Sequence, residues 1–392
     1  MGTQGSTAAR NAGGPPALAG SPTGGDRSPG VEEAGNARTS PGAAAPRQRA
    51  QWADAAKGAC IILVVLWHVI VKDYLQIRWH VGLPVPSAWG TLGEQLLPLR
   101  MPLFFTISGV FAANAVNRPW RVLGRSRIAK FLYLYAVWLL IHTAILAAVP
   151  DFLTARAGSV SELVEQLTIT PSNLWYLYAL ALYFAFAKAV RRVPRPVVLA
   201  AAAALSVITA AGVLATPGDR GGFYQNLVFF LGGLYLKPHV ERWAATATNR
   251  RLALTFVVYA AALTAMAVAG AQRWVGVWPA VSVAAVAFGV TAAARVSRWR
   301  AVGDALAALG RRTLPIYVIH MPLLALLHRF LVGPMSGLGG DGQALAVAGY
   351  PILLTTVVIG LSLAIHRGLL AARARWLFEL PGPRRRAAPG RT

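Results

Sequence analysis

The chain has 392 residues, of which 56% are hydrophobic and 13% are charged, and its mean hydropathy is +0.50. This composition is too apolar for a soluble multidomain protein and indicates an all-α, polytopic membrane protein. The net charge of +24 lies in basic connections between apolar segments, so it does not indicate a nucleic-acid-binding domain. The single cysteine, Cys60, rules out an intrachain disulfide and a cysteine metal site.

The apolar runs predict the domain organisation. Residues 1–50 are rich in Gly, Ala, Pro, Ser and Thr, and we expect a disordered cytoplasmic tail there. Residues 51–372 should form the membrane domain, and residues 373–392 a basic cytoplasmic tail. With about 17 to 25 residues for each crossing, we expect ten transmembrane helices. They lie near residues 55–74, 98–116, 130–149, 172–190, 197–215, 222–238, 252–270, 274–293, 313–332 and 344–368.

The distribution of Lys and Arg predicts the orientation. The even-numbered connections hold most of the basic residues, whereas the odd-numbered ones hold few, such as Arg78, Arg156, Arg220 and Arg273. Under the positive-inside rule both termini face the cytoplasm, in a multi-pass protein of the cell membrane. The basic triplet at residues 384–386 agrees with this, as a topology signal or as a contact with membrane lipids.

The first run carries the pattern Asp54-x-x-Lys57, ten residues, His68. An imidazole inside a membrane is costly and indicates a functional site. Eleven helical residues return to nearly the starting direction, so Lys57 and His68 can share one face about 16 Å apart. Asp54 is expected either to cap this helix or to pair with Lys57.

The second run begins Leu99-Arg100-Met101-Pro102-Leu103-Phe104-Phe105 and continues through Thr106 and Ile107 to Ser108-Gly109. Gly109 with Ala113 is a small-xxx-small pattern suited to close helix packing. Arg100 lies at the outer end, against the positive-inside trend. It could pair with a carboxylate such as Glu94 or stabilise a developing oxyanion.

Later stretches add further polar candidates. Two basic pairs precede the third run, Arg118-x-x-Arg121 and Arg127-x-x-Lys130, and the fourth run begins Asn173-Leu-Trp175-Tyr176. The ninth run reads Thr313-Leu-Pro315-Ile-Tyr317-Val-Ile-His320-Met-Pro322. Tyr317 and His320 share a face, and the two prolines predict a broken helix whose freed carbonyls need a polar lining.

The remaining histidines have no motif around them. His142 lies in the third run at a depth similar to that of His68, and His80, His239, His328 and His366 lie in loops or at helix ends. No His, Asp or Glu cluster has the spacing of metal ligands, so we predict no metal centre.

These stretches together resemble the acyltransferase-three family of integral-membrane O-acyltransferases. The first run is similar to the family's first-helix signature, which more often has Arg where this chain has Lys57. The second, fourth and ninth runs resemble its Pro-Leu-Phe-Phe…Ser-Gly, Leu-Trp-Phe/Tyr-Leu and Thr-Leu…Tyr-Leu…His motifs. The family's Arg-x-x-Arg pair matches Arg127 and Lys130 by position, or Arg118 and Arg121 by identity.

The resemblance implies transfer of an acyl group, most often acetyl, from cytoplasmic acyl-CoA to a hydroxyl of a carbohydrate or another cell-envelope acceptor. His68 would be the general base or a transient acyl carrier, with Asp54 and Arg100 as further catalytic residues. Lys57, Arg127, Lys130, Tyr317 and His320 would contact the donor. The expected partners are acyl-CoA, a carbohydrate or lipid-linked saccharide and membrane lipids, with no bound cofactor and no nucleic acid.

Two other hypotheses remain open on the sequence. In a transporter or lipid-linked saccharide flippase, His68 and His320 would relay protons and broken helices would line a pathway. We see no internal repeat and few membrane carboxylates, which argues against coupled transport. An inactive scaffold would not need the intact spacing between Lys57 and His68.

Overall fold

The structure, a computed structural model, describes residues 44–82 and 84–382. All of them belong to one compact unit, Gly42–Thr392. Most of the two predicted tails lies outside the described residues, which contain helices and no β-strand. The α-helices are α1 (Ala44–Lys72), α2 (Val85–Gln95), α3 (Leu97–Val116), α4 (Trp120–Leu123), α5 (Lys130–Ala147), α6 (Val160–Thr168), α7 (Trp175–Ala189), α8 (Arg195–Ala210), α9 (Gly221–Gln225), α10 (Leu227–Tyr235), α11 (Lys237–Ala245), α12 (Asn249–Val268), α13 (Val277–Val296), α14 (Arg300–Gly310), α15 (Thr313–Ser336) and α16 (Gly340–Ala371).

Short helical turns connect them. They are the 3₁₀ turns η1 (Tyr74–Gln76), η3 (Val190–Arg192), η4 (Pro217–Asp219), η5 (Ala271–Arg273) and η6 (Arg375–Leu377), and the π-helix η2 (Gly124–Ala129).

The all-α membrane fold is confirmed, and the described residues contain seven helical segments long and apolar enough to cross a membrane. They correspond to seven of the ten predicted runs. The other three runs, near residues 172–190, 197–215 and 222–238, form the shorter helices α7, α8 and α10 of 15, 16 and 9 residues. The residues near 222–238 divide between α9 and α10, because the chain turns at Asn226.

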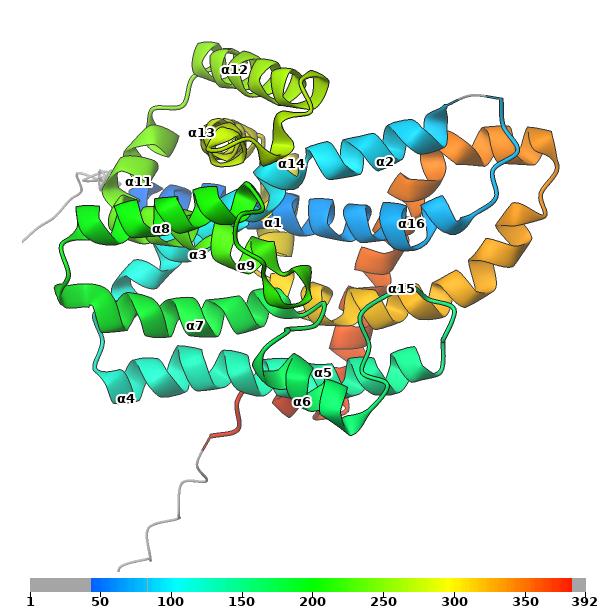
Figure 1. The fold of residues 1–392 in the computed structure, drawn as a ribbon, viewed down its shortest axis with the longest axis horizontal. Coiled ribbons are helices and arrows are strands. Elements are labelled where there is room, and N and C mark those ends of the chain that lie inside the picture. The colour runs from blue at the N-terminus through cyan, green and yellow to red at the C-terminus, as the bar shows by residue number, and fades with distance from the viewer. Residues whose placement is uncertain (1–43, 83, 383–392) are drawn as a thin grey trace, which may run out of the picture. The chain divides into compact units, whose positions relative to one another are not determined.

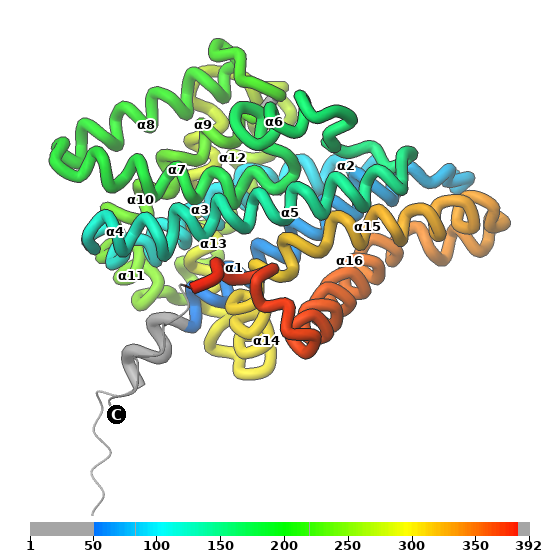
Figure 2. The backbone as a smooth tube through the Cα atoms, turned by 90° about the horizontal axis from the view of Figure 1, so that it is seen from below, coloured from blue at the N-terminus to red at the C-terminus, as the bar shows by residue number. Residues whose placement is uncertain are grey.

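Helix α1 lies at the centre of a group of packed helices. It contacts α2, α3, α13, α14, α15 and α16, which surround it in two perpendicular views (Figures 1 and 2). Glycines allow the closest approaches. A Cβ on Gly58 would collide with the backbone of Leu306 in α14, and one on Gly310 with the backbone of Asp54. Helix α14 therefore lies directly against the first half of α1.

Helices α3 and α10 meet in the same way. A Cβ on Gly109 would collide with the Phe230 carbonyl, and one on Gly233 with the Thr106 carbonyl. Gly109 therefore serves close packing, as its small-xxx-small pattern predicted. This contact fixes α3, which carries Arg100 and Phe104, against α10.

The structure corrects several predicted boundaries. Helix α1 begins at Ala44, so residues 44–50 are helical and Asp54 lies inside the helix, not at its cap. The outer connection near residues 75–97 contains α2, and the one near 150–171 contains α6. A hydropathy pattern detects long apolar runs. It therefore does not detect the polar start of α1 or the short helices α2 and α6.

Helix α15 is continuous, so the prediction of a broken helix is wrong. Pro322 has no N–H to donate to the carbonyl of Val318, four residues earlier. His142 in α5 replaces that donor, since its Nε2 lies 2.8 Å from the Val318 oxygen. Pro351 in α16 similarly frees the Val347 carbonyl, and the Tyr74 hydroxyl donates to it at 2.8 Å. Side chains from neighbouring helices thus allow both helices to continue through proline.

Candidate active site

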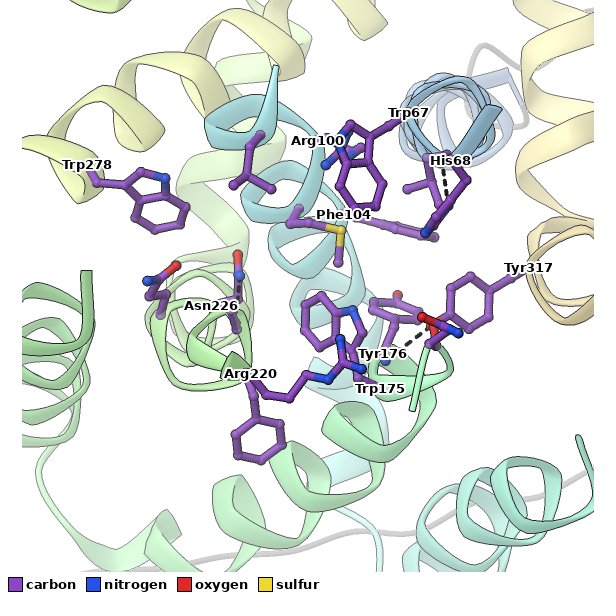
Figure 3. Close-up of a pocket in the computed structure, with 17 residues that line it drawn as sticks. Trp67, His68, Arg100, Phe104, Trp175, Tyr176, Arg220, Asn226, Trp278 and Tyr317 are labelled. Atoms are coloured by element: carbon purple, nitrogen blue, oxygen red, sulfur yellow. Dashed lines mark hydrogen bonds between the residues drawn. The ribbon is translucent and has the colours of Figure 1, made fainter. Parts of the chain in front are cut away.

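Two neighbouring cavities share three aromatic lining residues, Phe104, Tyr176 and Tyr317. The histidine cavity, about 240 Å³, is lined by 17 residues that include His68, Arg100 and Arg220 (Figure 3). The lysine cavity, about 340 Å³, includes Lys57, Arg127 and Lys130 in its lining. Because α1 is one continuous helix, it presents Lys57 to one cavity and His68 to the other.

His68 is in contact with His320. Nε2 of His320 in α15 lies 3.2 Å from Nδ1 of His68 in α1. Nδ1 of His320 lies 2.7 Å from the Tyr317 carbonyl oxygen and 3.1 Å from that of Ile316, in the preceding turn of its own helix. A carbonyl oxygen only accepts, so Nδ1 of His320 carries the hydrogen and, in the neutral ring, Nε2 is an acceptor.

The same argument assigns the tautomer of His68. Its Nδ1 lies between the Val64 carbonyl oxygen, at 2.9 Å, and the acceptor Nε2 of His320. Nδ1 of His68 therefore carries the hydrogen, and the lone pair of the neutral ring is on Nε2. Within the described part of the chain, no hydrogen bond engages that Nε2. The geometry leaves the cavity-lining imidazole with a free basic nitrogen.

Arg100 is the most deeply buried cation of the histidine cavity. Arg100 is 3% exposed, and its guanidinium lies over the face of the Trp67 ring, 4.7 Å from the ring centre. The predicted pair with Glu94 does not form, and among the described residues Arg100 has no carboxylate partner. Its charge is therefore available to an anion or to a developing negative charge in the cavity.

The rest of the histidine cavity is aromatic and amide-rich. Figure 3 shows Trp67, Trp175 and Trp278 around it, with Arg220 extending toward Trp175. Asn226 is 1% exposed, and its Oδ1 has no hydrogen-bond partner among the described residues. No Asp or Glu is among the described residues that line either cavity.

Three cations surround the lysine cavity. The Lys57 ammonium lies 2.8 Å from the Asp54 carboxylate and 4.5 Å from the centre of the Phe111 ring. Arg127 lies in the π-helix η2, and Lys130 follows directly as the first residue of α5. Single π-helical turns are frequent at functional sites, because the wider turn changes the direction of the side chains.

The wall between the cavities consists of the residues that line both, which are Phe104, Tyr176 and Tyr317. The rings of Phe104 and Tyr176 are stacked, with centroids 4.6 Å apart and an angle of 14° between their planes. The Tyr176 hydroxyl lies 2.7 Å from the hydroxyl of Ser108, which donates to the Phe104 carbonyl. Tyr317 donates to the Asn173 carbonyl at 3.0 Å and accepts from the Tyr176 N–H at 3.2 Å.

Two of the predicted site residues line neither cavity. Asp54 lies behind Lys57, where its carboxylate contacts Lys57 and, at 4.0 Å, Arg311. It thus pairs with Lys57, one of the two roles expected for it. His320 is 2% exposed and contacts His68 rather than the lysine cavity.

The structure also separates the two basic pairs that precede α5. Arg127 and Lys130 line the lysine cavity, whereas Arg118 and Arg121 are exposed and do not. Of the two pairs, the one that matches by position lines this cavity, and the one that matches by identity does not.

Sequence reasoning missed several buried or half-buried polar residues. Arg220 was noted only as a connection charge, yet it lies against the positive-inside trend, the signal that singled out Arg100. His328 is buried, and its Nδ1 lies 3.0 Å from Asp73, which also accepts from the Tyr350 hydroxyl at 2.7 Å.

Lys188 is buried too and donates to the Val116 and Arg118 carbonyls at the end of α3.

The residues that the structure describes include no group of three or more His, Cys, Asp or Glu arranged to hold a metal ion. His142 contacts the Val318 carbonyl and not the His68 pair.

The helices and the two cavities define a multi-pass helical membrane protein with a histidine site beside a basic one. Residues 50–367 match the model of a family described as an acyltransferase domain. The match spans most of the chain, so the chain belongs to the acyltransferase-three family, as its motifs predicted.

Other comparisons are more limited. The inner membrane protein YcfT of Escherichia coli (strain K12) is 27% identical over 165 residues, which are 38% of this chain and 46% of that protein. The chain thus spans about half the length of this curated relative. No solved structure matches the chain.

Proposed function

We propose that the protein transfers an acyl group, acetyl in the first place, from cytoplasmic acyl-CoA to a hydroxyl group of a carbohydrate or another cell-envelope acceptor, in the cell membrane. One observation carries the proposal. His68, whose Nε2 is engaged by no hydrogen bond among the described residues, lines a cavity that shares an aromatic wall with a second cavity lined by three cations.

The lysine cavity suits the donor. Acyl-CoA carries several phosphates, and Lys57, Arg127 and Lys130 offer them cationic donors around one cavity. The positive-inside rule assigns this end of α1 to the cytoplasm, where acyl-CoA is found. Asp54 contacts Lys57 and so holds its ammonium in place, which makes Asp54 a positioning residue.

The histidine cavity suits a carbohydrate acceptor. The tryptophans Trp67, Trp175 and Trp278 offer apolar faces, and polar side chains between them offer hydrogen bonds. The unpartnered Oδ1 of Asn226 can accept from a hydroxyl group. A binding site for a polyol needs this combination of flat apolar surface and fixed polar atoms.

In the proposed reaction, Nε2 of His68 removes the proton of the acceptor hydroxyl as its oxygen attacks the thioester carbonyl carbon. Arg100 stabilises the negative charge that develops on the carbonyl oxygen. The C–S bond then breaks, the sulfur of CoA leaves with the proton from the imidazolium, and the ester product remains. His320 accepts the Nδ1–H of His68 and stabilises the imidazolium formed during the attack.

An acyl-imidazole intermediate is the alternative chemical route. In that route Nε2 of His68 attacks the thioester carbonyl carbon, the C–S bond breaks and CoA leaves as the thiolate. In a second step the acceptor hydroxyl takes the acyl group, the neutral imidazole is regenerated, and the hydroxyl proton neutralises the thiolate. Both routes use the same nitrogen. Release of CoA in the absence of acceptor, in a single burst, distinguishes the second route from the first.

The contact between His68 and His320 is also the geometry that a proton relay in a transporter would use. Because no described carboxylate lines either cavity, the relay would lack an acidic partner. Acyl transfer accounts for the cations of the lysine cavity as well, and we favour it.

The test is release of CoA from acetyl-CoA by the purified protein in lipid vesicles, with a crude envelope-saccharide fraction as acceptor. We expect radiolabel from acetyl-CoA in the saccharide with the wild type and none with His68→Ala. His239→Ala is the matched control, because His239 is exposed and lies far along the chain from the motifs that carry His68 and His320. Saccharide movement without any CoA release, lost in His68→Ala, would instead support transport.

A further inference from the structure

The wall between the two cavities is built of three large rings. Phe104, Tyr176 and Tyr317 are 3%, 7% and 6% exposed, and they line both cavities. The stacked pair of Phe104 and Tyr176 joins α3 to α7, while Tyr317 comes from α15. The rings of Tyr176 and Tyr317 meet edge to face, with centroids 5.6 Å apart.

Hydrogen bonds fix two of these rings. Tyr317 is tied to the start of α7 through the Asn173 carbonyl and the Tyr176 N–H. The Tyr176 hydroxyl is held by Ser108. Phe104 has no polar group in its side chain, so its ring is held by packing alone. The wall therefore has two anchored members and one whose size can be changed without removing a hydrogen bond.

The position of this wall restricts the donor. The cations that suit the CoA phosphates line only the lysine cavity, whereas His68 lines only the histidine cavity. The thioester carbonyl must reach an oxygen activated by His68, so it must lie at the wall. Any carbon of the acyl chain beyond that carbonyl then competes for space with the rings or with the acceptor in a cavity of about 240 Å³.

We propose that Phe104 and Tyr176 determine the acyl chain length, and that they restrict the donor to short acyl groups such as acetyl. This inference rests on the proposed acyl transfer. Phe104 is the residue that excludes longer chains, because its large ring lines both cavities. Tyr176 supports it from the opposite side of the stack, held in place by Ser108.

The experiment is a competition between acetyl-CoA and butyryl-CoA in one reaction, with purified protein in vesicles and the two ester products counted by mass spectrometry. The ratio of products is independent of how much protein is folded. We expect the butyryl to acetyl ratio to rise about tenfold or more in Phe104→Ala, because one methylene in an apolar pocket already changes selectivity by about tenfold. Phe104→Leu should give a smaller rise.

Phe184→Ala is the matched control. Phe184 is a buried phenylalanine that lines only the lysine cavity, so its removal enlarges that cavity without opening the wall. We expect its product ratio to equal that of the wild type. An equal rise in Phe184→Ala and Phe104→Ala would overturn the inference, because the wall would not be where selection occurs.

Two further results would also overturn it. One is a wild-type enzyme that already uses butyryl-CoA as well as acetyl-CoA. The other is an unchanged ratio in an active Phe104→Ala variant or, should that variant not fold, in Phe104→Leu. If the wild type transfers no acyl group from either donor, the proposed function itself has failed. If the wild type transfers acetyl but the butyryl to acetyl ratio of the variant is unchanged, only the present inference has failed.

Discussion

His68 and His320, 252 residues apart in the sequence, share a contact of 3.2 Å between Nδ1 of the first and Nε2 of the second. The carbonyls of Val64 and Tyr317 assign the tautomers of both rings. As a result, the lone pair of His68 is directed away from His320. The second histidine therefore acts on the first through its position and its acceptor nitrogen.

Replacing His68 should remove the base. We expect His68→Gln to lower kcat for acyl transfer by about 10²- to 10⁴-fold, the usual contribution of a general base. The measurement is label transfer to the saccharide under saturating acetyl-CoA. Binding of a non-hydrolysable acyl-CoA analogue should be retained, since His68 does not line the lysine cavity. A variant with full transfer activity would contradict the assignment.

Replacing His320 should have a smaller and graded effect. We expect His320→Leu to lower kcat and to leave the KM for acyl-CoA unchanged, because His320 lines neither cavity. His320→Gln should recover part of the activity, since its amide oxygen can accept from Nδ1 of His68. A rise in the KM for acyl-CoA in His320→Leu would instead support the direct donor contact expected from the sequence.

Replacing Lys57 should weaken donor binding. We expect Lys57→Met to raise the KM for acyl-CoA about tenfold or more, because a charge-assisted contact to phosphate is lost. Lys57→Arg should keep most of the affinity. The measurement is a titration of donor at fixed acceptor. Equal KM values for wild type and Lys57→Met would exclude Lys57 from the donor site.

Two adjacent glycines of α10 give a matched pair for stability. Gly233→Ala should destabilise the protein by about 1 to 3 kcal/mol, since its Cβ would collide with the Thr106 carbonyl of α3. Gly232→Ala should be neutral or stabilising, because nothing lies within 4 Å of its Cβ position and Ala favours helix. Thermal unfolding in detergent measures both. Equal shifts would contradict the close packing of α3 and α10.

The contact between His142 and the Val318 carbonyl can be tested in a double-mutant cycle with Pro322. His142→Leu should cost about 1 to 3 kcal/mol, because the Val318 carbonyl loses its donor. Pro322→Ala restores a backbone N–H four residues after Val318 and should recover part of that loss in the double variant. Additive effects of the two substitutions on the thermal midpoint would show that they do not share this carbonyl.

The sequence predicted the elements that depend on local pattern. Long apolar runs identified the seven longest helical segments, and the motif spacing placed Lys57 and His68 on one helix. Four of the five residues expected to contact the donor, namely Lys57, Arg127, Lys130 and Tyr317, line the lysine cavity. Their functional roles remain predictions.

What could not be predicted depends on contacts between distant segments. The path of α15 through Pro322 depends on a histidine from α5, and prolines alone indicated a break. Nothing local to His320 shows that it meets His68, and nothing local to His328 shows that it meets Asp73. Arg220 joins Arg100 in one cavity only because α9 and α3 pack near α7.

The two histidine contacts of α15 have a joint consequence for the precision of the site. His320 meets His68, and eight residues later His328 meets Asp73, five residues after His68. Both contacts join the same pair of chain segments, so a slip of α15 by one residue, about 1.5 Å, would break both at once. Buried Asp73 thus helps to fix the register of α15 against α1. We therefore expect a substitution of Asp73 to displace His320 relative to His68, although neither histidine is itself changed.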